Sequence, residues 1–156
     1  MDRYQFRSFN VPDHFIRHSN FQGELTRKTG PMDDFAFVML RRGSGNRVAL
    51  RSVNFPDRYL RHRDFRIWLE GPRDGDDQLF QQDSTFYFEK GLADAEGVSF
   101  RSFNFPDRYL RHRDFHLWVE APTGDADQVF RKDATFYRQP APVLIDHGTE
   151  LVPVDE

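Results

Sequence analysis

The sequence has no cysteine among its 156 residues, so it can form no disulfide bond and offers no thiolate chemistry. It also lacks long apolar runs, and no segment approaches the roughly 20 residues that a membrane-spanning helix needs. Residues 1–7 lack the apolar core of a signal peptide. We therefore expect a soluble chain with no membrane partner. As written it is untargeted, and an extracellular location would require a preceding signal peptide.

An excess of positive charge is absent as well. The 22 basic and 25 acidic residues give a formal net charge of -3 and are interleaved along the chain. Nucleic-acid binding usually needs a clustered basic face, so the sequence predicts no nucleic-acid partner.

Sequence signatures of catalysis are also missing. The chain contains no Gly-rich phosphate loop, no Gly-x-Ser-x-Gly elbow and no His-Glu-x-x-His motif. Paired carboxylates could indicate a glycosidase, but the acidic residues here recur with an internal repeat, whereas an active site is normally unique in a chain. We predict a protein that is not an enzyme and has no catalytic residue, cofactor or metal.

Phenylalanine, with 17 residues, and an internal repeat are what the chain has in abundance. Twelve residues, Asn54 to Phe65, recur without a change as Asn104 to Phe115, and a looser copy runs from Asn10 to Phe21. An Arg-Ser pair precedes each copy. The repeat divides residues 1–138 into three units, at about 1–46, 47–96 and 97–138.

A second motif closes each unit. It reads Asp83-Ser84-Thr85-Phe86 in the second unit, Asp133-Ala134-Thr135-Phe136 in the third and Asp34-Phe35-Ala36-Phe37 in the first. The interval from the repeat's histidine to this aspartate is 21 residues in units two and three but 16 in unit one. The first unit is therefore shorter in its middle.

Each unit is predicted to contain four short strands, which in the third unit are Val98–Phe103, Tyr109–His112, Phe115–Val119 and Thr135–Tyr137. Helical periodicity is absent, and Leu92 to Ala95 makes at most one turn. A propeller normally needs at least four blades, so three units of four strands favour an all-β fold, the β-trefoil. The aromatic residues of the repeat are predicted to be core: Phe55, Tyr59, Phe65, Trp68, Phe80 and Phe86, with their third-unit equivalents.

Residues 139–156 lie outside the repeat. Pro140 and Pro142 begin this stretch, and Val143-Leu144-Ile145 could add a strand. Two possibilities stay open: a tail packed on the barrel, or the start of a linker.

These motifs resemble a known family. The pattern Arg-Ser-x-Asn-Phe-Pro-x-Arg-Tyr-Leu-Arg-His-x-Asp/Asn-Phe, followed about twenty residues later by Phe-x-x-Asp-Ala/Ser-Thr-Phe, resembles the AbfB-type arabinofuranose-binding domain, carbohydrate-binding module family 42, over roughly residues 5–138. The resemblance implies a non-catalytic β-trefoil. It also implies binding of arabinofuranose side chains of arabinoxylan or arabinan, with one sugar per pocket.

The resemblance also implies site residues. In that family the aspartate that opens the closing motif bonds the sugar hydroxyls, and the histidine and the residue after it form the wall. Relatives often have tyrosine as that following residue, whereas this chain has arginine. The implied ligand-binding residues are His62, Arg63, Asp64 and Asp83 in unit two, and His112, Arg113, Asp114 and Asp133 in unit three. A weaker third pocket in unit one would use His18, Asn20 and Asp34.

The residues alone leave alternatives open. The histidines could be structural, the aspartates could cap a turn, and Arg61, Arg63, Arg111 and Arg113 could be solvated surface. Three related histidines could also meet on the three-fold axis as a zinc site, although outward-facing pockets disfavour this. The competing function is a trefoil that serves protein interaction or structure, with its sugar pockets repurposed. We expect a monomer and an arabinose-containing polysaccharide or oligosaccharide as partner.

Overall fold

The structure, a computed structural model, describes residues 2–74, 77–124, 127–144 and 151–153. The first unit contains β1 (Arg3–Ser8), β2 (Phe15–Ser19), β3 (Gln22–Thr26), the 3-10 helix η1 (Met32–Phe35) and β4 (Phe37–Arg41). The second contains β5 (Arg47–Ser52), β6 (Tyr59–Arg63), β7 (Arg66–Glu70), α1 (Gln78–Asp83) and β8 (Phe86–Lys90). The third contains β9 (Val98–Ser102), β10 (Tyr109–Arg113), β11 (His116–Glu120), α2 (Gln128–Asp133) and β12 (Phe136–Pro140).

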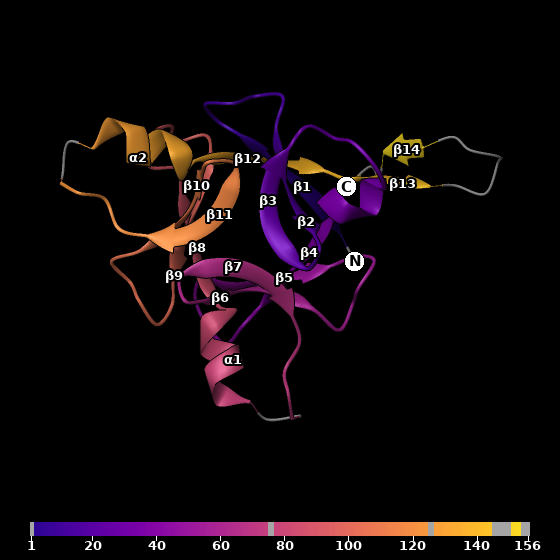
Figure 1. The fold of residues 1–156 in the computed structure, drawn as a ribbon, viewed down its shortest axis with the longest axis horizontal. Helices are drawn as coiled ribbons and strands as arrows, with labels where there is room; N and C mark the ends of the chain where they lie inside the picture. The colour runs from indigo at the N-terminus through magenta and orange to yellow at the C-terminus, as the bar shows by residue number, and fades with distance from the viewer. Residues whose placement is uncertain (1, 75–76, 125–126, 145–150, 154–156) are drawn as a thin grey trace.

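The first and fourth strands of the three units close into a barrel. Antiparallel pairing runs from β1 to β4, β5, β8, β9 and β12, and β12 returns to β1 (Figure 1). Closure removes the free sheet edges that an open sheet would leave.

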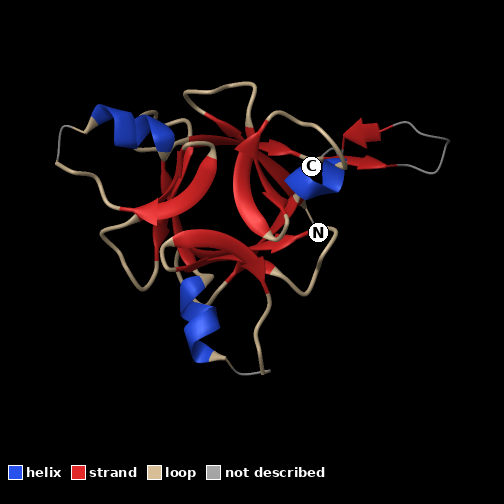
Figure 2. Cartoon of the chain, viewed as in Figure 1, coloured by secondary structure: helices blue, strands red, loops and turns tan. Residues whose placement is uncertain are grey.

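The second and third strands of each unit form a hairpin, and the three hairpins cap one end of the barrel. They meet in a triangle through single pairings of β3 with β7, β7 with β11 and β11 with β3. Figure 2 shows these curved strands around a common centre, with the helices outside them. A closed barrel with a triangular cap is the predicted β-trefoil, and the four strands of each unit are confirmed.

Equivalent positions of the three units fill the core. Alternation along the strands turns apolar side chains inward, and the set repeats from unit to unit. Four fully buried positions occur in every unit: Phe6, Leu50 and Phe100; Ile16, Leu60 and Leu110; Leu25, Leu69 and Val119; and Phe37, Phe86 and Phe136.

The expectation of no helix beyond one turn at Leu92 to Ala95 is wrong. Helices α1 and α2 have six residues each and follow the hairpins of units two and three. The side chains of Asp77 and Asp127 cap their N-termini by accepting the backbone N–H groups of Phe80 and Phe130. A helix of six residues is too short to show a periodic apolar pattern in the sequence. A single buried phenylalanine, Phe80 or Phe130, anchors each helix to the barrel.

The prediction that the aromatic residues of the repeat belong to the core is also wrong for some of them. Phe80 and Phe86 are buried, as are Phe130 and Phe136. By contrast, Phe55 is 36% exposed, and Tyr59, Phe65 and Trp68 are only partly buried. The third-unit equivalents behave in the same way, because Phe105 and Phe115 are exposed while Tyr109 and Trp118 are partly buried.

Turn geometry explains the exposed phenylalanines in the hairpins. Each hairpin has a two-residue loop in which both residues have positive φ, between 53° and 63°. Asparagine and aspartate tolerate this left-handed conformation better than most residues. The loops are Asn20-Phe21, Asp64-Phe65 and Asp114-Phe115.

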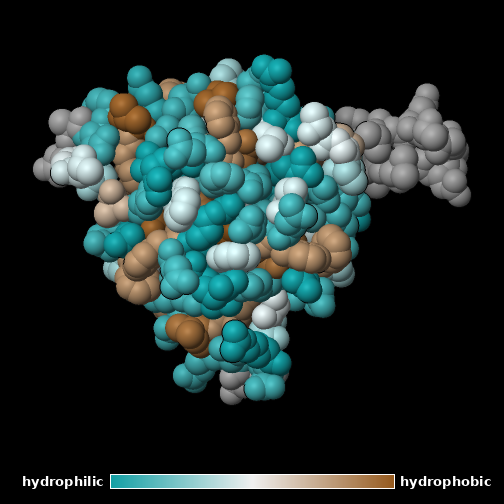
Figure 3. All heavy atoms as spheres, viewed as in Figure 1, coloured by the Kyte–Doolittle hydropathy of each residue, from teal (hydrophilic) through white to brown (hydrophobic). Residues whose placement is uncertain are grey.

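Outside the barrel, β13 (Pro142–Leu144) and β14 (Leu151–Pro153) pair as a separate two-stranded sheet. A strand at Val143-Leu144 is therefore confirmed, and Ile145 lies outside the described residues. No helix in the described part of the chain is long and apolar enough to cross a membrane. Figure 3 shows hydrophilic side chains over most of the visible face, with hydrophobic ones scattered among them.

The three-fold axis of the cap requires one glycine. Ile67 and Leu117 occupy equivalent positions in units two and three, and Gly23 holds that position in unit one. A Cβ atom on Gly23 would lie 2.6 Å from Cγ2 of Ile67 and 3.1 Å from Cδ1 of Leu117. Two large side chains fill the axis, so the third position must be empty.

We therefore expect Gly23→Ala to lower the free energy of unfolding by about 1–3 kcal/mol through overpacking. Urea denaturation followed by circular dichroism measures this change. Gly124→Ala is the control, because a Cβ atom on Gly124 would have no neighbouring atom within 4 Å, and it should leave stability unchanged. Ile67→Ala should partly relieve the Gly23→Ala effect, and strict additivity of the two changes would contradict the proposed crowding.

Candidate functional site

A buried polar network forms the floor of a cavity in unit two. Arg61 Nη2 donates to Oδ2 of Asp83 at 2.6 Å, and Asn104 Nδ2 donates to Oδ1 of Asp83 at 2.8 Å. His62 Nε2 lies 2.9 Å from Oδ1 of Asn104 and 3.4 Å from Oδ1 of Asp83. The predicted pair His62 and Asp83 is therefore brought together, with Arg61 and Asn104 as partners.

The same network occurs in unit three. Arg111 Nη2 donates to Asp133 at 2.5 Å, and Asn10 Nδ2 donates to the other carboxylate oxygen of Asp133 at 2.8 Å. His112 Nε2 lies 2.8 Å from Oδ1 of Asn10 and 3.4 Å from Oδ1 of Asp133.

Unit one keeps the network despite its shorter middle. Arg17 Nη2 donates to Asp34 at 2.7 Å, Asn54 Nδ2 donates to Asp34 at 2.9 Å, and His18 Nε2 lies 2.9 Å from Asn54 Oδ1. What unit one lacks is the helix beside the network, because the turn η1 stands in its place. Asn20 lies in the hairpin loop with positive φ.

Each network joins two units, because its asparagine comes from the unit that follows. A buried serine holds that asparagine loop: Ser102 Oγ donates to Asn104 Oδ1 at 3.2 Å and accepts the backbone N–H of Phe105 at 3.2 Å. Ser8 and Ser52 make the equivalent bonds in the other units. This contact explains the Arg-Ser pair that precedes every repeat.

The network fixes the tautomer of the histidine. The carboxylate of Asp83 can only accept, so the Asn104 group facing it is the amide NH2, and the amide oxygen faces His62. His62 Nε2 must then carry a proton, which leaves Nδ1 of the neutral ring as a hydrogen-bond acceptor.

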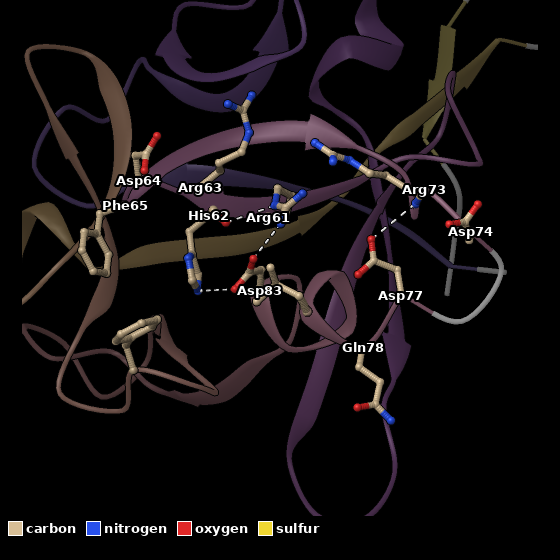
Figure 4. A pocket seen from close by; sticks show the side chains of 12 residues that line it. Arg61, His62, Arg63, Asp64, Phe65, Arg73, Asp74, Asp77, Gln78 and Asp83 are labelled. Atoms are coloured by element: carbon tan, nitrogen blue, oxygen red, sulfur yellow. Dashed lines mark hydrogen bonds and ion pairs between the residues drawn. The ribbon is translucent and has the colours of Figure 1, made fainter.

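A cavity of about 730 Å³ lies over the floor in unit two. Figure 4 shows His62, Arg61 and Asp83 converging at its base. Phe65, Phe105 and Leu79 supply apolar walls. The two phenylalanine rings meet edge to face at 5.2 Å. The wall of this pocket is thus shared between units, as its floor is.

The walls of the three pockets differ. In unit one Phe21 and Phe55 form the equivalent ring pair, with centroids 5.2 Å apart. In unit three Val11 stands where the other pockets have Phe55 or Phe105, and the ring of Phe115 packs instead on His14 at 5.2 Å. Helix and phenylalanine pair therefore occur together only in the unit-two pocket.

In units two and three the arginine that follows the histidine turns away from the floor. Arg63 donates to Glu70 at 3.0 Å, and its guanidinium lies 4.1 Å from the ring centroid of Trp68; in Figure 4 it points away from Asp83. Arg113 makes the equivalent contacts with Glu120 and Trp118.

The aspartates of the hairpin loops are held by backbone geometry rather than by the network. Asp64 borders the unit-two cavity from the left-handed turn position. The side chain of Asp114 is 84% exposed. Neither makes a hydrogen bond to the floor residues in the described part of the chain.

Sequence reasoning missed two members of the network. Arg61 and Arg111 were expected at the solvated surface, but their side chains are only 11% and 12% exposed. The sequence analysis gives Asn104 and its equivalents no place in a pocket, but each bonds the floor aspartate. A usable signal was present: arginine before the histidine and the asparagine that opens the repeat occur in all three copies, whereas Arg63 is replaced by Ser19 in unit one.

Burial lowers the pKa of His112 below its ordinary value, and Arg111 and His14 add to this effect, whereas the Asp133 carboxylate only partly opposes it. Burial acts to raise the pKa of Glu120, but its bonds with Arg113 and Arg111 outweigh this and hold that pKa below its usual range. The lowered pKa of His112 favours its neutral ring.

The three histidines do not meet on the axis, because each bonds a different asparagine. Within the described ranges, no group of three or more histidine, cysteine, aspartate or glutamate side chains is placed to hold a metal ion.

Comparison with solved structures identifies the class. A designed three-fold symmetric protein, ThreeFoil, superposes with a TM-score of 0.66 at 8% identity, covering 87% of this chain and 96% of that one. A Polyporus squamosus lectin gives 0.69 at 7% identity, covering 91% of this chain and 50% of that one. The fold is a β-trefoil.

An arabinofuranosidase complexed with arabinofuranosyl-α-1,2-xylobiose gives a TM-score of 0.78 at 24% identity. The alignment covers 90% of this chain but only 31% of that chain. The family model of the α-L-arabinofuranosidase B (AbfB) domain matches residues 40–138, well over half of the chain. The chain therefore belongs to the AbfB domain family. A comparison with curated proteins gives no match.

The lowered pKa of His112 predicts a pH dependence of stability. Below the unfolded pKa of about 6.5, the unfolded chain binds more protons at this position than the folded chain. The contribution of the neutral His112 ring to the free energy of unfolding is therefore fully present above pH 6.5. It is lost as the pH falls below that value. Urea denaturation between pH 8 and pH 5 should show a steeper loss for the wild type than for His112→Gln. Parallel curves would contradict a depressed pKa.

Proposed function

We propose that this AbfB domain binds arabinofuranose side chains of arabinoxylan or arabinan without catalysis, in the pockets of units two and three. The observation that carries the proposal is the repeated floor of aspartate, histidine, arginine and asparagine. In unit two this floor lies at the base of a cavity with an aromatic wall. The similarity to part of an enzyme solved with an arabinofuranosyl oligosaccharide supports this choice of sugar.

The floor is suited to hydroxyl groups. Two carboxylate oxygens offer about four lone-pair directions, and Arg61 and Asn104 use two of them on Asp83. The remaining directions can accept sugar hydroxyls, and charged acceptors make the stronger bonds. The acceptor nitrogen of His62 adds a further partner for a hydroxyl. The arginine and asparagine fix the carboxylate in advance, so binding does not have to order it.

The wall is suited to the apolar side of the sugar. Phe65 and Phe105 are partly exposed at the cavity, although buried phenylalanine would gain more from the hydrophobic effect. Arg108 packs on Phe65, its guanidinium 3.7 Å from the ring centroid, and holds that ring in place. One ring pair and one carboxylate suit a weak ligand, with a dissociation constant on the order of a millimolar. Two pockets on one polymer raise retention by avidity.

Catalysis does not fit this floor. Glycoside hydrolysis uses two carboxylates on either side of the scissile bond, one of which acts as a proton donor. Asp83 already accepts from a guanidinium, and the nearby Asp77 is engaged as a helix cap. The same floor also recurs in every unit, as expected for recognition.

We expect Asp83→Asn combined with Asp133→Asn to weaken binding to arabinoxylan at least about tenfold, because bonds from sugar hydroxyls to a charged acceptor are lost. Affinity electrophoresis in arabinoxylan gels measures retention. Asparagine is chosen because alanine would leave the buried arginine unpaired. Far-UV circular dichroism and cooperative unfolding verify the fold, and Asp34→Asn is the control in unit one. Unchanged retention of the folded double variant would refute the site.

Exchanging the wall residue between the two pockets tests whether the phenylalanine contacts the sugar. Phe105→Val gives unit two the residue that unit three has at Val11, and should weaken binding at unit two about three- to tenfold through loss of ring contact. Val11→Phe should strengthen binding at unit three. Titration with an arabinofuranosyl oligosaccharide, followed by nuclear magnetic resonance signals near each pocket, separates the two sites. If neither exchange alters affinity, the phenylalanine does not contact the sugar.

A further inference from the structure

A second cavity adjoins the unit-two pocket. It has a volume of about 570 Å³ and shares Arg61 and Arg73 with the first cavity. Because Arg73 borders both, it stands where a ligand longer than one sugar would pass from one cavity to the other. A cavity of 730 Å³ already has room for more than a single pentose.

The guanidinium of Arg73 borders both cavities and is unpaired with respect to the described residues. Figure 4 shows its side chain reaching back over Asp77 toward Arg61 rather than outward. Its backbone N–H contacts Asp77 at 3.5 Å. Its guanidinium makes no hydrogen bond or salt bridge with a described residue, and its charge acts on the carboxylate of Asp77.

The surrounding charges favour an anion on the side of the second cavity. Arg58, Arg61 and Arg73 border that cavity, together with Asp57 and Glu70. Arg61 is already paired with Asp83 and Glu70, so Arg58 and Arg73 supply the remaining positive charge. Glu70 is already neutralised, since Arg61 lies 3.2 Å and Arg63 3.0 Å from its oxygens. Asp74 borders only the first cavity. Asp77 also acts on Arg73 through charge, but its carboxylate caps α1 by accepting the backbone N–H of Phe80. A ligand carboxylate in the second cavity could therefore bond the guanidinium of Arg73 without breaking a salt bridge between described residues.

Unit three provides a natural comparison. The residue equivalent to Arg73 is Thr123, whose hydroxyl donates to the helix-capping Asp127 at 2.8 Å. The cavity beside it is bordered by Thr123, Gly124, Asp127, Gln128 and Val129, without a basic residue. The two pockets therefore share a floor but differ in charge at this position.

We infer that Arg73 forms a subsite for a carboxylate-bearing sugar, a uronic acid, that neighbours the sugar held on the unit-two floor. This inference rests on the proposed function, because the floor must hold the first sugar. A guanidinium binds a carboxylate through two parallel hydrogen bonds, and this geometry distinguishes an acidic sugar from a neutral one. Unit three should show no such preference.

The test measures the affinity of one pocket at a time. Asp133→Asn leaves unit two as the sugar site, and Asp83→Asn leaves unit three. Each background is titrated by calorimetry with a neutral arabinoxylo-oligosaccharide and with the same oligosaccharide carrying a glucuronic acid branch. In the unit-two background we expect the acidic ligand to bind about fivefold more tightly, as for a solvent-exposed ion pair. This gain should fade at high salt.

Variants assign the gain to Arg73. Arg73→Thr should bring the two ligands to equal affinity in the unit-two background, and Thr123→Arg should create a preference for the acidic ligand in the unit-three background. Arg41→Thr is the matched control: it removes the same charge from an exposed residue that borders neither cavity, and the gain should persist.

The outcomes separate the two proposals. Equal affinity for both ligands in the wild-type unit-two pocket overturns the acidic subsite and leaves the proposed function standing. A gain that survives Arg73→Thr overturns the assignment to this residue. Failure of both ligands to bind in either background, with the fold intact, refutes the proposed function itself.

Discussion

The aspartate on each pocket floor depends on hydrogen bonds from two units at once. An arginine of its own unit and an asparagine of the next unit both donate to it, as at Asp83 with Arg61 and Asn104. A buried carboxylate without such partners would be costly. Correct closure of the barrel therefore supplies the asparagine and makes the site, so that folding and site assembly depend on the same seams between units.

The three pockets have the same floor residues but different wall residues, because only the floor residues are constrained by bonds to one another. The floor residues satisfy each other in a buried setting, so a change in one leaves another unpaired. Wall residues such as Val11, Phe105, Arg73 and Thr123 meet solvent and can differ without that penalty. The three pockets can therefore diverge in ligand preference while the fold stays symmetrical.

The sequence was informative where a pattern is local. Strand alternation and the three-fold repeat favour the trefoil, and the resemblance to the AbfB-type family implies that His62 and Asp83 share a pocket. Long-range contacts were not accessible in this way. Asn104 has no predicted pocket role, because nothing local shows that its side chain bonds a carboxylate of the preceding unit, 21 residues earlier.

Small shifts in element boundaries had larger effects. Phe115 was placed at the start of a strand, and by alternation in the core. The strand begins one residue later, at His116, and Phe115 belongs to a turn with positive φ. Its ring therefore leaves the sheet. Six-residue helices were missed for a similar reason, since a single turn and a half carries too few residues to show a period of 3.6.

The seam between the last unit and the first has a consequence for how such a domain can arise. Asn10, near one end of the chain, completes the pocket of His112 and Asp133, near the other. A single unit thus carries two half-sites and no whole one: its histidine and aspartate serve one pocket, and its asparagine serves the previous pocket. An ancestral unit of this design could have formed complete pockets only as a ring of three separate chains. Gene fusion would then have joined pockets that were already complete in structure.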